Sequence, residues 1–311
     1  ETVDIEHPDM RHDIANPDQP KTAPGYILAA LHRRRALGLK PFTVMSCDNL
    51  PSNGKKLHAI LVKLAGLRST EFADFIETDV ACPSTMIDRI VPQTTDGDRV
   101  LAKAALNLED AWPIATEPFT QWVIEDHFPE GRPDWDRFGA ELVDDVAPYE
   151  AMKLRLLNAS HTMLAFLGSL AGYRMVADAM NDKVIGSFIT RFMDEDVIPV
   201  LTIRPGGDVQ AYAASLQERF RNPALNHRLE QIASDSSQKI PQRFLGTAQD
   251  RLAQGRPLGR LAYAIAGFAL YVLGRDEAGQ TLALNDPMAE RLRQSLVAAG
   301  NDPEAIIHAL L

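Results

Sequence analysis

Cysteine, long apolar runs and positive charge are all scarce in this sequence. Two cysteines in 311 residues are too few for a disulfide framework or a four-cysteine zinc site. The longest apolar run, 261–273, is shorter than the roughly 18–20 residues that cross a bilayer. The formal net charge is −10, and no basic stripe indicates a nucleic-acid surface. We therefore expect a cytoplasmic protein that binds neither membranes nor nucleic acids.

Motifs that hold phosphates or metal ions are also missing. The sequence has no GxGxxG or GxxxxGK[ST] loop, and no HxxxH, CxxC or HExxH spacing. A GxSxG turn, which would present a nucleophilic serine, is absent as well. These residues alone should therefore bind a nucleotide weakly, and we expect no metal site.

Two patterns divide the chain. A helix, an apolar run, turn residues and a second helix follow one another over 24–67, with a buried strand expected over 41–46. From about Pro148 onward, helical patterns punctuated by glycine and proline dominate. The sequence predicts an α/β domain over residues 1–105 and a mainly α-helical domain over residues 106–311.

The most informative segment ends at His161. On an α-helix with about 100° per residue, Lys153, Asn158 and His161 would project from one side over about 12 Å of helix length. Apolar neighbours would desolvate the lysine, which could make it a base near neutral pH. An amide and an imidazole beside it could bind oxygens of a polyhydroxy substrate. Taken alone, however, these residue types are more often a solvated lysine, a helix end and a core histidine.

The ordered motifs of the chain resemble those of the mannitol dehydrogenase family, the metal-independent polyol and sugar-acid dehydrogenases. Lys153, Asn158 and His161, with four and two residues between them, match the family signature. The other segments that agree in order and spacing are 41–50 with Asn53 and Gly54, 86–92, 117–126, 131–133, 149–153, 219–223 and 235–241. The resemblance implies an α/β remnant of a Rossmann domain followed by a mainly α-helical C-terminal domain.

Two departures from the family pattern concern the ends of the chain. Family members carry an N-terminal Rossmann half with a GxGxF-type fingerprint, and this sequence begins after it. The last residues, 305–311, also stop short of the usual end. We therefore expect part of a dehydrogenase. A non-catalytic remnant without cofactor binding stays open, whereas a metal-dependent hydrolase or isomerase is disfavoured by the missing ligand clusters.

The resemblance implies reversible hydride transfer between NAD or NADP and C2 of a linear polyol or sugar acid. Lys153 would be the general base, and Asn158 with Asn49 would donate hydrogen bonds to the developing alkoxide. The remaining implied roles are substrate binding by His161, Asp88 and Lys239, proton relay by Glu150, and cofactor binding by Ser46 and Asp48. Two alternatives stay open: Glu150 could be an ordinary solvated carboxylate, and Asp48 could stabilise the turn.

The substrate is suggested by residues 227–243. Mannitol-preferring relatives tend to place an arginine where this chain has Gln231, and the run resembles the fructuronate reductases, which interconvert D-fructuronate and D-mannonate. His227, Arg228 and Arg243 could supply positive charge for a carboxylate. Segment 46–54 is closer to the mannitol enzymes. We expect the sugar acid as substrate, with a mannitol/fructose-type polyol 2-dehydrogenase as the alternative.

Overall fold

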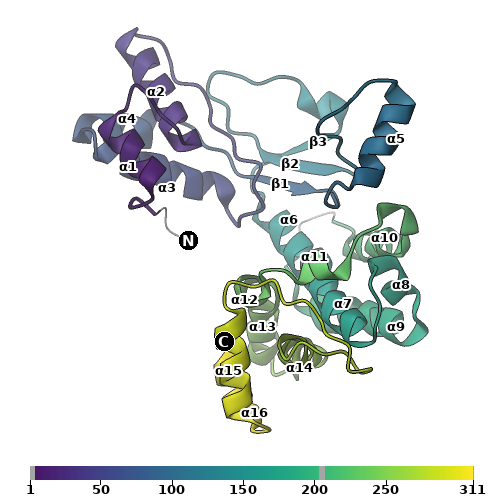
Figure 1. Ribbon diagram of the computed structural model, residues 1–311. Coiled ribbons are helices and arrows are strands. Elements are labelled where there is room, and N and C mark those ends of the chain that lie inside the picture. The colour runs from purple at the N-terminus through teal and green to yellow at the C-terminus, as the bar shows by residue number, and fades with distance from the viewer. Residues whose placement is uncertain (1–3, 203–206, 311) are drawn as a thin grey trace. The chain divides into compact units, whose positions relative to one another are not determined.

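The computed structural model describes residues 4–202 and 207–310, and the chain divides into two compact units (Figure 1). The units are Glu1–Asp88 with Thr120–Glu150, and Arg89–Phe119 with Ala151–Leu311. The boundary predicted at 105/106 therefore falls inside one segment of the second unit. The chain on each side of segment 89–119 forms a strand of the sheet in the first unit. The segment itself is hydrogen-bonded to the helical part of the second unit.

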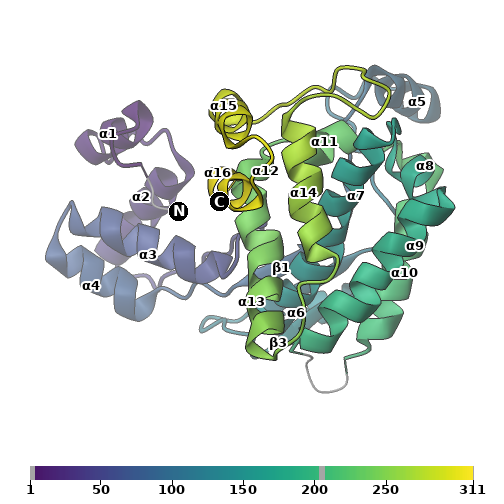
Figure 2. The same ribbon diagram turned by 90° about the horizontal axis from the view of Figure 1, so that it is seen from below.

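Residues 4–88 of the first unit contain four helices, and two of them begin at a threonine or serine cap. Thr22 accepts a hydrogen bond from the Gly25 amide at the start of one helix, and Ser69 accepts one from the Phe72 amide at another. These helices are α1 (Pro8–Ala15), α2 (Ala23–Ala36), α3 (Asn53–Gly66) and α4 (Thr70–Asp79). α3 and α4 lie side by side (Figure 2) and bury Leu61 and Ile76 between them and α2. The helices expected on either side of 41–46 are thus confirmed.

A small mixed sheet completes the first unit. β1 (Thr85–Asp88) pairs antiparallel with β2 (Gln121–Glu125), which pairs parallel with β3 (Ala140–Val143). The 3₁₀ turn η1 (Trp135–Phe138) precedes β3, and the helix α6 (Ala147–Met152) follows it. The paired Met86 and Val123 are buried against Val146 and Tyr149. The apolar face of the sheet therefore fixes where α6 begins.

The strand expected over 41–46 is wrong. This run is extended backbone that forms isolated bonds: the Val44 amide donates to the Ala81 carbonyl at 2.9 Å, and Thr85 Oγ1 donates to the Ser46 carbonyl at 2.6 Å. A strand needs a regular ladder with a neighbour. Because only single bonds link the run to 81–85, no ladder forms within the described residues.

The second unit is helical around one continuous apolar core. The helical pattern predicted from about Pro148 onward is confirmed. Its elements are α5 (Asp96–Leu106), η2 (Lys153–Asn158), α7 (Ala159–Leu170), α8 (Val176–Asn181), α9 (Lys183–Arg191), η3 (Phe192–Val197), η4 (Ile198–Val200), α10 (Val209–Arg221), η5 (Pro223–Leu225), α11 (Leu229–Ala233), α12 (Ser236–Ile240), η6 (Pro241–Leu245), α13 (Gly246–Ala253), α14 (Leu261–Val272), α15 (Ala289–Ala299) and α16 (Pro303–Leu310).

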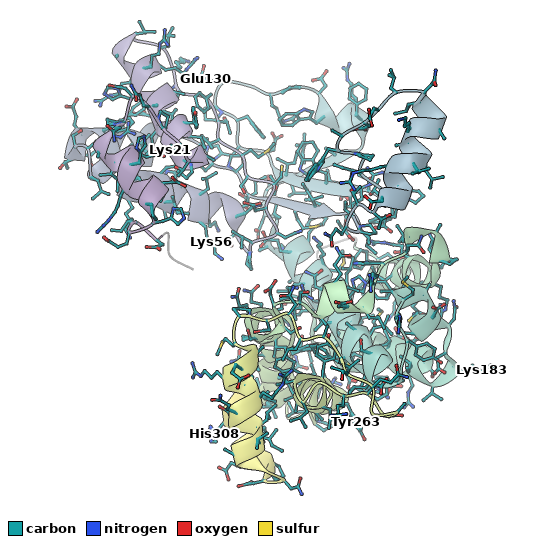
Figure 3. The ribbon with its side chains drawn as sticks, in the orientation of Figure 1. Lys21, Lys56, Glu130, Lys183, Tyr263 and His308 are labelled. Atoms are coloured by element: carbon teal, nitrogen blue, oxygen red, sulfur yellow. The ribbon has the colours of Figure 1, made fainter. Side chains whose placement is uncertain are left out.

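The longest apolar run of the sequence forms α14, which packs against α7 (Figure 2). Phe268 lies 5.3 Å and Tyr271 5.6 Å from Phe166 of α7 between ring centroids. Tyr263 of the same helix points outward and is 61% exposed (Figure 3). Across residues 4–202 and 207–310, no helix has both the length and the hydropathy needed to span a membrane.

Three elements of the second unit, η2, η3 and η6, are π-helical among the described residues. Their backbone amides bond five residues back, so each turn is wider than an α-turn. The continuous α-helix assumed for Lys153 to His161 is therefore wrong over Lys153–Asn158. Such segments recur at functional sites because they re-aim side chains and free backbone groups.

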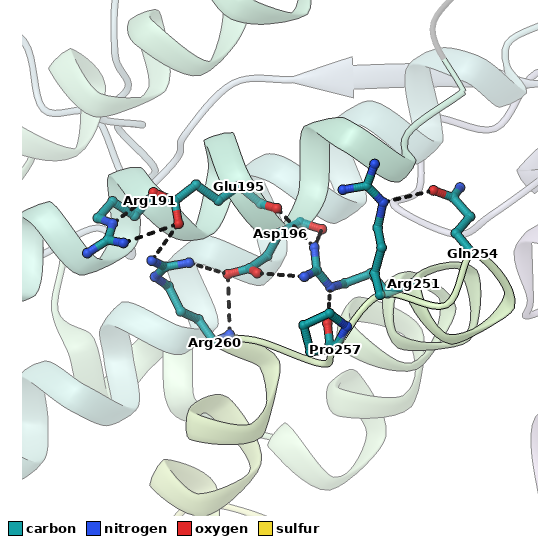
Figure 4. A network of polar contacts seen from close by, with 8 residues as sticks. Arg191, Glu195, Asp196, Arg251, Gln254, Pro257 and Arg260 are labelled. Atoms are coloured by element: carbon teal, nitrogen blue, oxygen red, sulfur yellow. Dashed lines mark hydrogen bonds and ion pairs between the residues drawn. The ribbon is translucent and has the colours of Figure 1, made fainter.

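A network of arginines and acids holds η3 in place (Figure 4). Asp196 is 2% exposed and receives Arg251 Nη2 at 3.2 Å and Arg260 Nη1 at 2.9 Å. Arg251 Nη1 also donates to the carbonyls of Glu195 and Asp196, both at 2.9 Å. These bonds satisfy backbone groups at the end of the π-helical segment and join it to α13 and to the start of α14.

A second buried ion pair fastens segment 89–119 to α10. Glu117 accepts hydrogen bonds from Arg219 Nη2 at 2.8 Å and Nε at 2.9 Å, a two-pronged geometry, and from the Ile90 amide at 2.5 Å. The two side chains are 2% and 7% exposed. The Arg219 guanidinium also lies over the ring of Phe119, 4.1 Å from its centroid.

Replacing one member of this pair should destabilise the second unit strongly. Glu117→Gln leaves the buried Arg219 guanidinium without a counter-charge, which typically costs about 3–5 kcal/mol of unfolding free energy. Glu117→Leu combined with Arg219→Met removes both charges and should cost less. Urea unfolding of the single and double variants measures this. A single variant within about 0.5 kcal/mol of wild type would contradict it.

Candidate active site

Four of the predicted residues of the first unit lie on or bond to the loop 46–52: Ser46, Asp48, Asn49 and Glu150. The side chain of Asn53, 2% exposed, fixes this loop: its Nδ2 donates to the carbonyls of Ser46 at 3.1 Å and Asp48 at 3.0 Å. The same amide donates to the Thr85 carbonyl at 3.0 Å and accepts from the Thr85 amide at 2.9 Å. Asn49 is exposed on the loop. Sequence reasoning gave Asn53 no role, although an Asn-Gly pair at the start of a helix was a signal.

Glu150 holds the far end of the same loop. Both of its carboxylate oxygens accept from the Ser52 amide, each at 3.1 Å, and Ser52 has a left-handed backbone with φ 51°. Burial raises the pKa of the Glu150 carboxyl above its ordinary value, and the nearby charges of Glu125 and Asp145 add to this. A carboxyl with a raised pKa binds a proton more readily than a solvated one, and the relay role stays a prediction. Asp88 ends β1 and is fully buried.

Gly54 allows the close approach that brings α3 to β1. A side-chain carbon at this position would lie 2.4 Å from the Cys82 carbonyl oxygen and 2.5 Å from the Pro83 carbonyl carbon. Any larger residue would push α3 away from the segment that leads into β1. The position of the loop 46–52 therefore depends on glycine here.

The predicted catalytic residues of the second unit lie along η2 and the start of α7. Lys153 is 8% exposed and His161 6% exposed, while Asn158 is half-buried at the junction of the two elements. η6 packs against η2 and carries Arg243, whose Nη1 donates to the Asn158 carbonyl at 3.3 Å and to the Thr162 hydroxyl. The backbone next to the predicted alkoxide donor is thus fixed by a side chain from another element.

Lys239 lies on α12, the helix that directly precedes η6 and Arg243. Its ammonium donates to the Ser234 carbonyl and to the Ile232 carbonyl at 3.4 Å, at the end of α11. Burial lowers the pKa of Lys239, and the positive charge of Arg243 lowers it further, while Asp235 and Asp286 act in the opposite direction. Burial also lowers the pKa of Arg243, to about 10. Two partly buried cations therefore stand next to one another.

His161 and His227 form an aromatic pair beside a cavity of about 150 Å³. The His161 ring stacks on the Phe220 ring, with 4.7 Å between the ring centroids. The His227 ring packs edge-on against the His161 ring, with 4.8 Å between their centroids. His161 Nε2 and His227 Nδ1 are buried and have no hydrogen-bond partner among the described residues. Burial lowers the pKa of His161 well below its usual range, with the charge of His227 as the next cause, and lowers that of His227 to about 4. Both imidazoles are therefore neutral at pH 7.

Arg228 is placed differently from the other predicted substrate-binding residues. Its guanidinium is exposed and pairs with Glu230 at 3.2 Å. The structure does not bring it into the group of Lys239, Arg243 and His161, and its role stays a prediction. Within the described ranges, no three His, Cys, Asp or Glu side chains are grouped as metal ligands.

Comparison with known proteins agrees with these observations. The sequence matches the model of the mannitol dehydrogenase Rossmann domain over residues 4–137 and that of the mannitol dehydrogenase C-terminal domain over residues 145–310. The chain belongs to the mannitol dehydrogenase family. The resemblance drawn from the sequence is confirmed, and so is the fold class of a Rossmann-type domain followed by a mainly helical C-terminal domain.

Among its relatives in this family are enzymes named for a sugar acid and for a polyol. The chain is 46% identical over 286 residues to the D-mannonate oxidoreductase of Escherichia coli (strain K12), covering 92% of this chain and 59% of the relative. It is 42% identical over 307 residues to the mannitol 2-dehydrogenase of Pyricularia oryzae, covering 97% and 61%. The chain thus spans about three fifths of the length of these relatives.

Two solved structures of dehydrogenases have the same fold as this chain. A ternary complex of Pseudomonas fluorescens mannitol 2-dehydrogenase with NAD and D-mannitol matches with a TM-score of 0.85 at 42% identity, over 99% of this chain and 62% of that one. A substrate-free D-sorbitol dehydrogenase matches with a TM-score of 0.89 at 35% identity, over 98% and 63%.

The neutral histidine pair should make stability fall on acidification. The unfolded chain takes up a proton on His227 below pH 6.5, whereas the folded chain does so only near pH 4. The unfolding free energy should therefore drop between these values, by up to about 1.4 kcal/mol per pH unit for each such histidine. Urea unfolding of His227→Gln at pH 7 and pH 5 should show a smaller drop than wild type.

His308→Gln, at an exposed position of α16 (Figure 3), controls for the loss of a histidine as such. An equal drop in wild type and His227→Gln would contradict the buried, neutral state of His227.

Proposed function

We propose that the protein to which this chain belongs is an NAD(P)-dependent oxidoreductase that interconverts D-mannonate and D-fructuronate, with Lys153 as the general base. The observation that carries the proposal is the buried lysine on a π-helical segment, followed on the same helix by Asn158 and His161. The partly buried cations Lys239 and Arg243 nearby favour a negatively charged substrate. Family membership supports the reaction class.

Proton transfer is the task of Lys153. An ordinary lysine, with a pKa of about 10.4, is almost fully protonated at pH 7 and cannot accept a proton. Burial disfavours the charged form of an amine, and Lys153 is 8% exposed. Its neutral amine would take the hydroxyl proton during oxidation and return it during reduction. Glu150, whose carboxyl holds a proton more readily than a solvated one, would pass this proton on to solvent.

Stabilisation of the developing alkoxide is the task of Asn158. Arg243 is bonded to its backbone carbonyl, which leaves the side-chain amide available to the substrate. One preorganised donor of this kind is typically worth about 2.7–4 kcal/mol in the transition state. Asn49 would be a second donor, and Asp88 and His161 would bind further hydroxyls.

NAD is the proposed cofactor, with NADP as the alternative, and it accepts the hydride when bound. Ser46 and Asp48 would contact it from the loop 46–52, where Asn53 fixes the backbone and both side chains are partly or fully exposed. The sequence has no glycine-rich loop for the phosphates. These residues on their own should therefore bind the cofactor weakly.

The second candidate substrate is a neutral polyol of the mannitol type. Relatives named mannitol 2-dehydrogenase are 40–42% identical to this chain, close to the 46% of the D-mannonate oxidoreductase. The unpaired positive charge at Arg243 favours the sugar acid. A non-catalytic role of the chain remains the alternative of a different class.

Replacing Lys153 with alanine in the full-length protein should lower kcat by at least about 10²–10⁴-fold, the typical contribution of a general acid–base group. Methylamine should restore part of this rate, because the variant leaves a lysine-sized space beside the reacting carbon. Steady-state rates of D-mannonate oxidation, with and without methylamine, measure both effects.

Asn158→Ala is the matched control on the same helix. It should slow turnover by about 10²–10³-fold through the lost alkoxide donor, and methylamine should not rescue it. Near-wild-type turnover in Lys153→Ala would overturn the proposed function.

A further inference from the structure

We propose that the guanidinium of Arg243 binds the carboxylate of the sugar-acid substrate and thereby sets the preference for sugar acids over neutral polyols. The inference rests on the proposed function, because it assigns the charged end of the same substrate. Four observations carry it: an unpaired charge, unused donors, the place of Arg243 beside Asn158, and the chemistry of the two candidate substrates.

The charge of Arg243 is not balanced. No carboxylate lies within 4 Å of its guanidinium among the described residues, although the side chain is partly buried. Two other arginines of the second unit that are partly or fully buried have such a partner: Arg155 pairs with Asp250 at 2.5 Å, and Arg219 pairs with Glu117. A buried cation without a counter-charge is destabilising. Such a cost is retained where a ligand supplies the missing anion.

Arg243 also has N–H groups that donate no hydrogen bond within the described part of the chain. Its Nη1 is occupied by the Asn158 carbonyl and the Thr162 hydroxyl. Its Nε and Nη2 have no acceptor among the described residues, and neither is sealed from solvent. Two parallel N–H groups on one edge of a guanidinium match the two oxygens of a carboxylate. The free edge of Arg243 therefore has the geometry for a bidentate contact.

The position of Arg243 places this contact at the predicted site. The bond to the Asn158 carbonyl keeps the guanidinium against η2, and Lys239 adds a second positive charge from the preceding helix. The positive charges of Arg243 and Lys239 both contribute to lowering the pKa of His161. Lys239, however, has Asp235 and Asp286 near it. Of the two cations, Arg243 is therefore the one without a nearby carboxylate, within the described residues, to balance its charge.

Substrate chemistry explains what such a group would select. D-Fructuronate carries its ketone at C2 and its carboxylate at C6, the opposite end of the carbon chain. Mannitol and fructose have a neutral hydroxymethyl group at that end. A guanidinium that contacts this end forms an ion pair with the sugar acid but not with the polyol. Groups around C2 make the same contacts with both substrates.

A purely structural role for Arg243 makes a different prediction. If the side chain only fixes the π-helical segment through the Asn158 carbonyl, its loss should disturb the reacting carbon of every substrate. Acid and polyol activities would then fall together. The two roles are separated by comparing two substrates in one variant.

The test uses the full-length protein with D-mannonate and D-mannitol. Arg243→Gln should lower kcat/KM for D-mannonate by about 10–150-fold, the range expected for a lost hydrogen-bonded charge contact, mainly through KM. D-Mannitol activity should fall as well, because Arg243 also bonds the Asn158 carbonyl, but by a clearly smaller factor than D-mannonate activity. Arg155→Gln, which replaces a partly buried arginine that already has its carboxylate, is the matched control and should not alter the ratio of the two substrates. Arg243→Lys keeps the charge and should recover part of the D-mannonate activity.

A salt titration of the wild type gives a second readout that needs no variant. Chloride should raise the KM for D-mannonate several-fold more than that for D-mannitol, because it competes for the same cation. Equal losses for both substrates in Arg243→Gln, or no selective effect of chloride, would overturn the inference and leave the proposed function standing. A wild type that oxidises neither substrate would overturn both.

Discussion

The ion pair of Glu117 and Arg219 is the interaction on which the second unit depends. Two charges that are almost fully buried lose several kcal/mol of hydration each, and only close, multiple hydrogen bonds offset this loss. Here Glu117 meets Arg219 through two bonds and the Ile90 amide through a third. Segment 89–119 is thereby tied to α10. The next residue along α10, Phe220, stacks on His161, so the pair also fixes the wall against which this imidazole lies.

Departures from α-helical geometry explain how one helix can present several functional groups. The chain from α6 into α7 widens over η2, where Lys153 and Asn158 lie. The widening is supported from outside, since Arg243 of η6 donates to the Asn158 carbonyl. Packing of η6 against η2 thus places the Arg243 guanidinium beside the backbone of Asn158, on the same π-helical segment as the buried Lys153. The charge left unpaired there is what distinguishes Arg243 from the structural arginines Arg219 and Arg251.

Local signals in the sequence were sufficient for the helices and for the family. Apolar spacing predicted α2 and α3, and the spacing of Lys153, Asn158 and His161 led to the family assignment. The strand at 41–46 could not be judged locally, because a strand requires a neighbour with which to form a ladder. The same holds for the site. A π-helical turn has no local pattern, and the anchoring role of Asn53 depends on Thr85, far along the chain.

Lys153 as the proton acceptor is the central claim, and the pH dependence of kcat/KM for oxidation of D-mannonate by the full-length protein tests it most directly. A general base must be deprotonated in the free enzyme to act. We predict that kcat/KM rises with pH to a plateau through one ionisation, and that this ionisation is absent from the profile of Lys153→Ala. The same ionisation in both profiles would contradict the account.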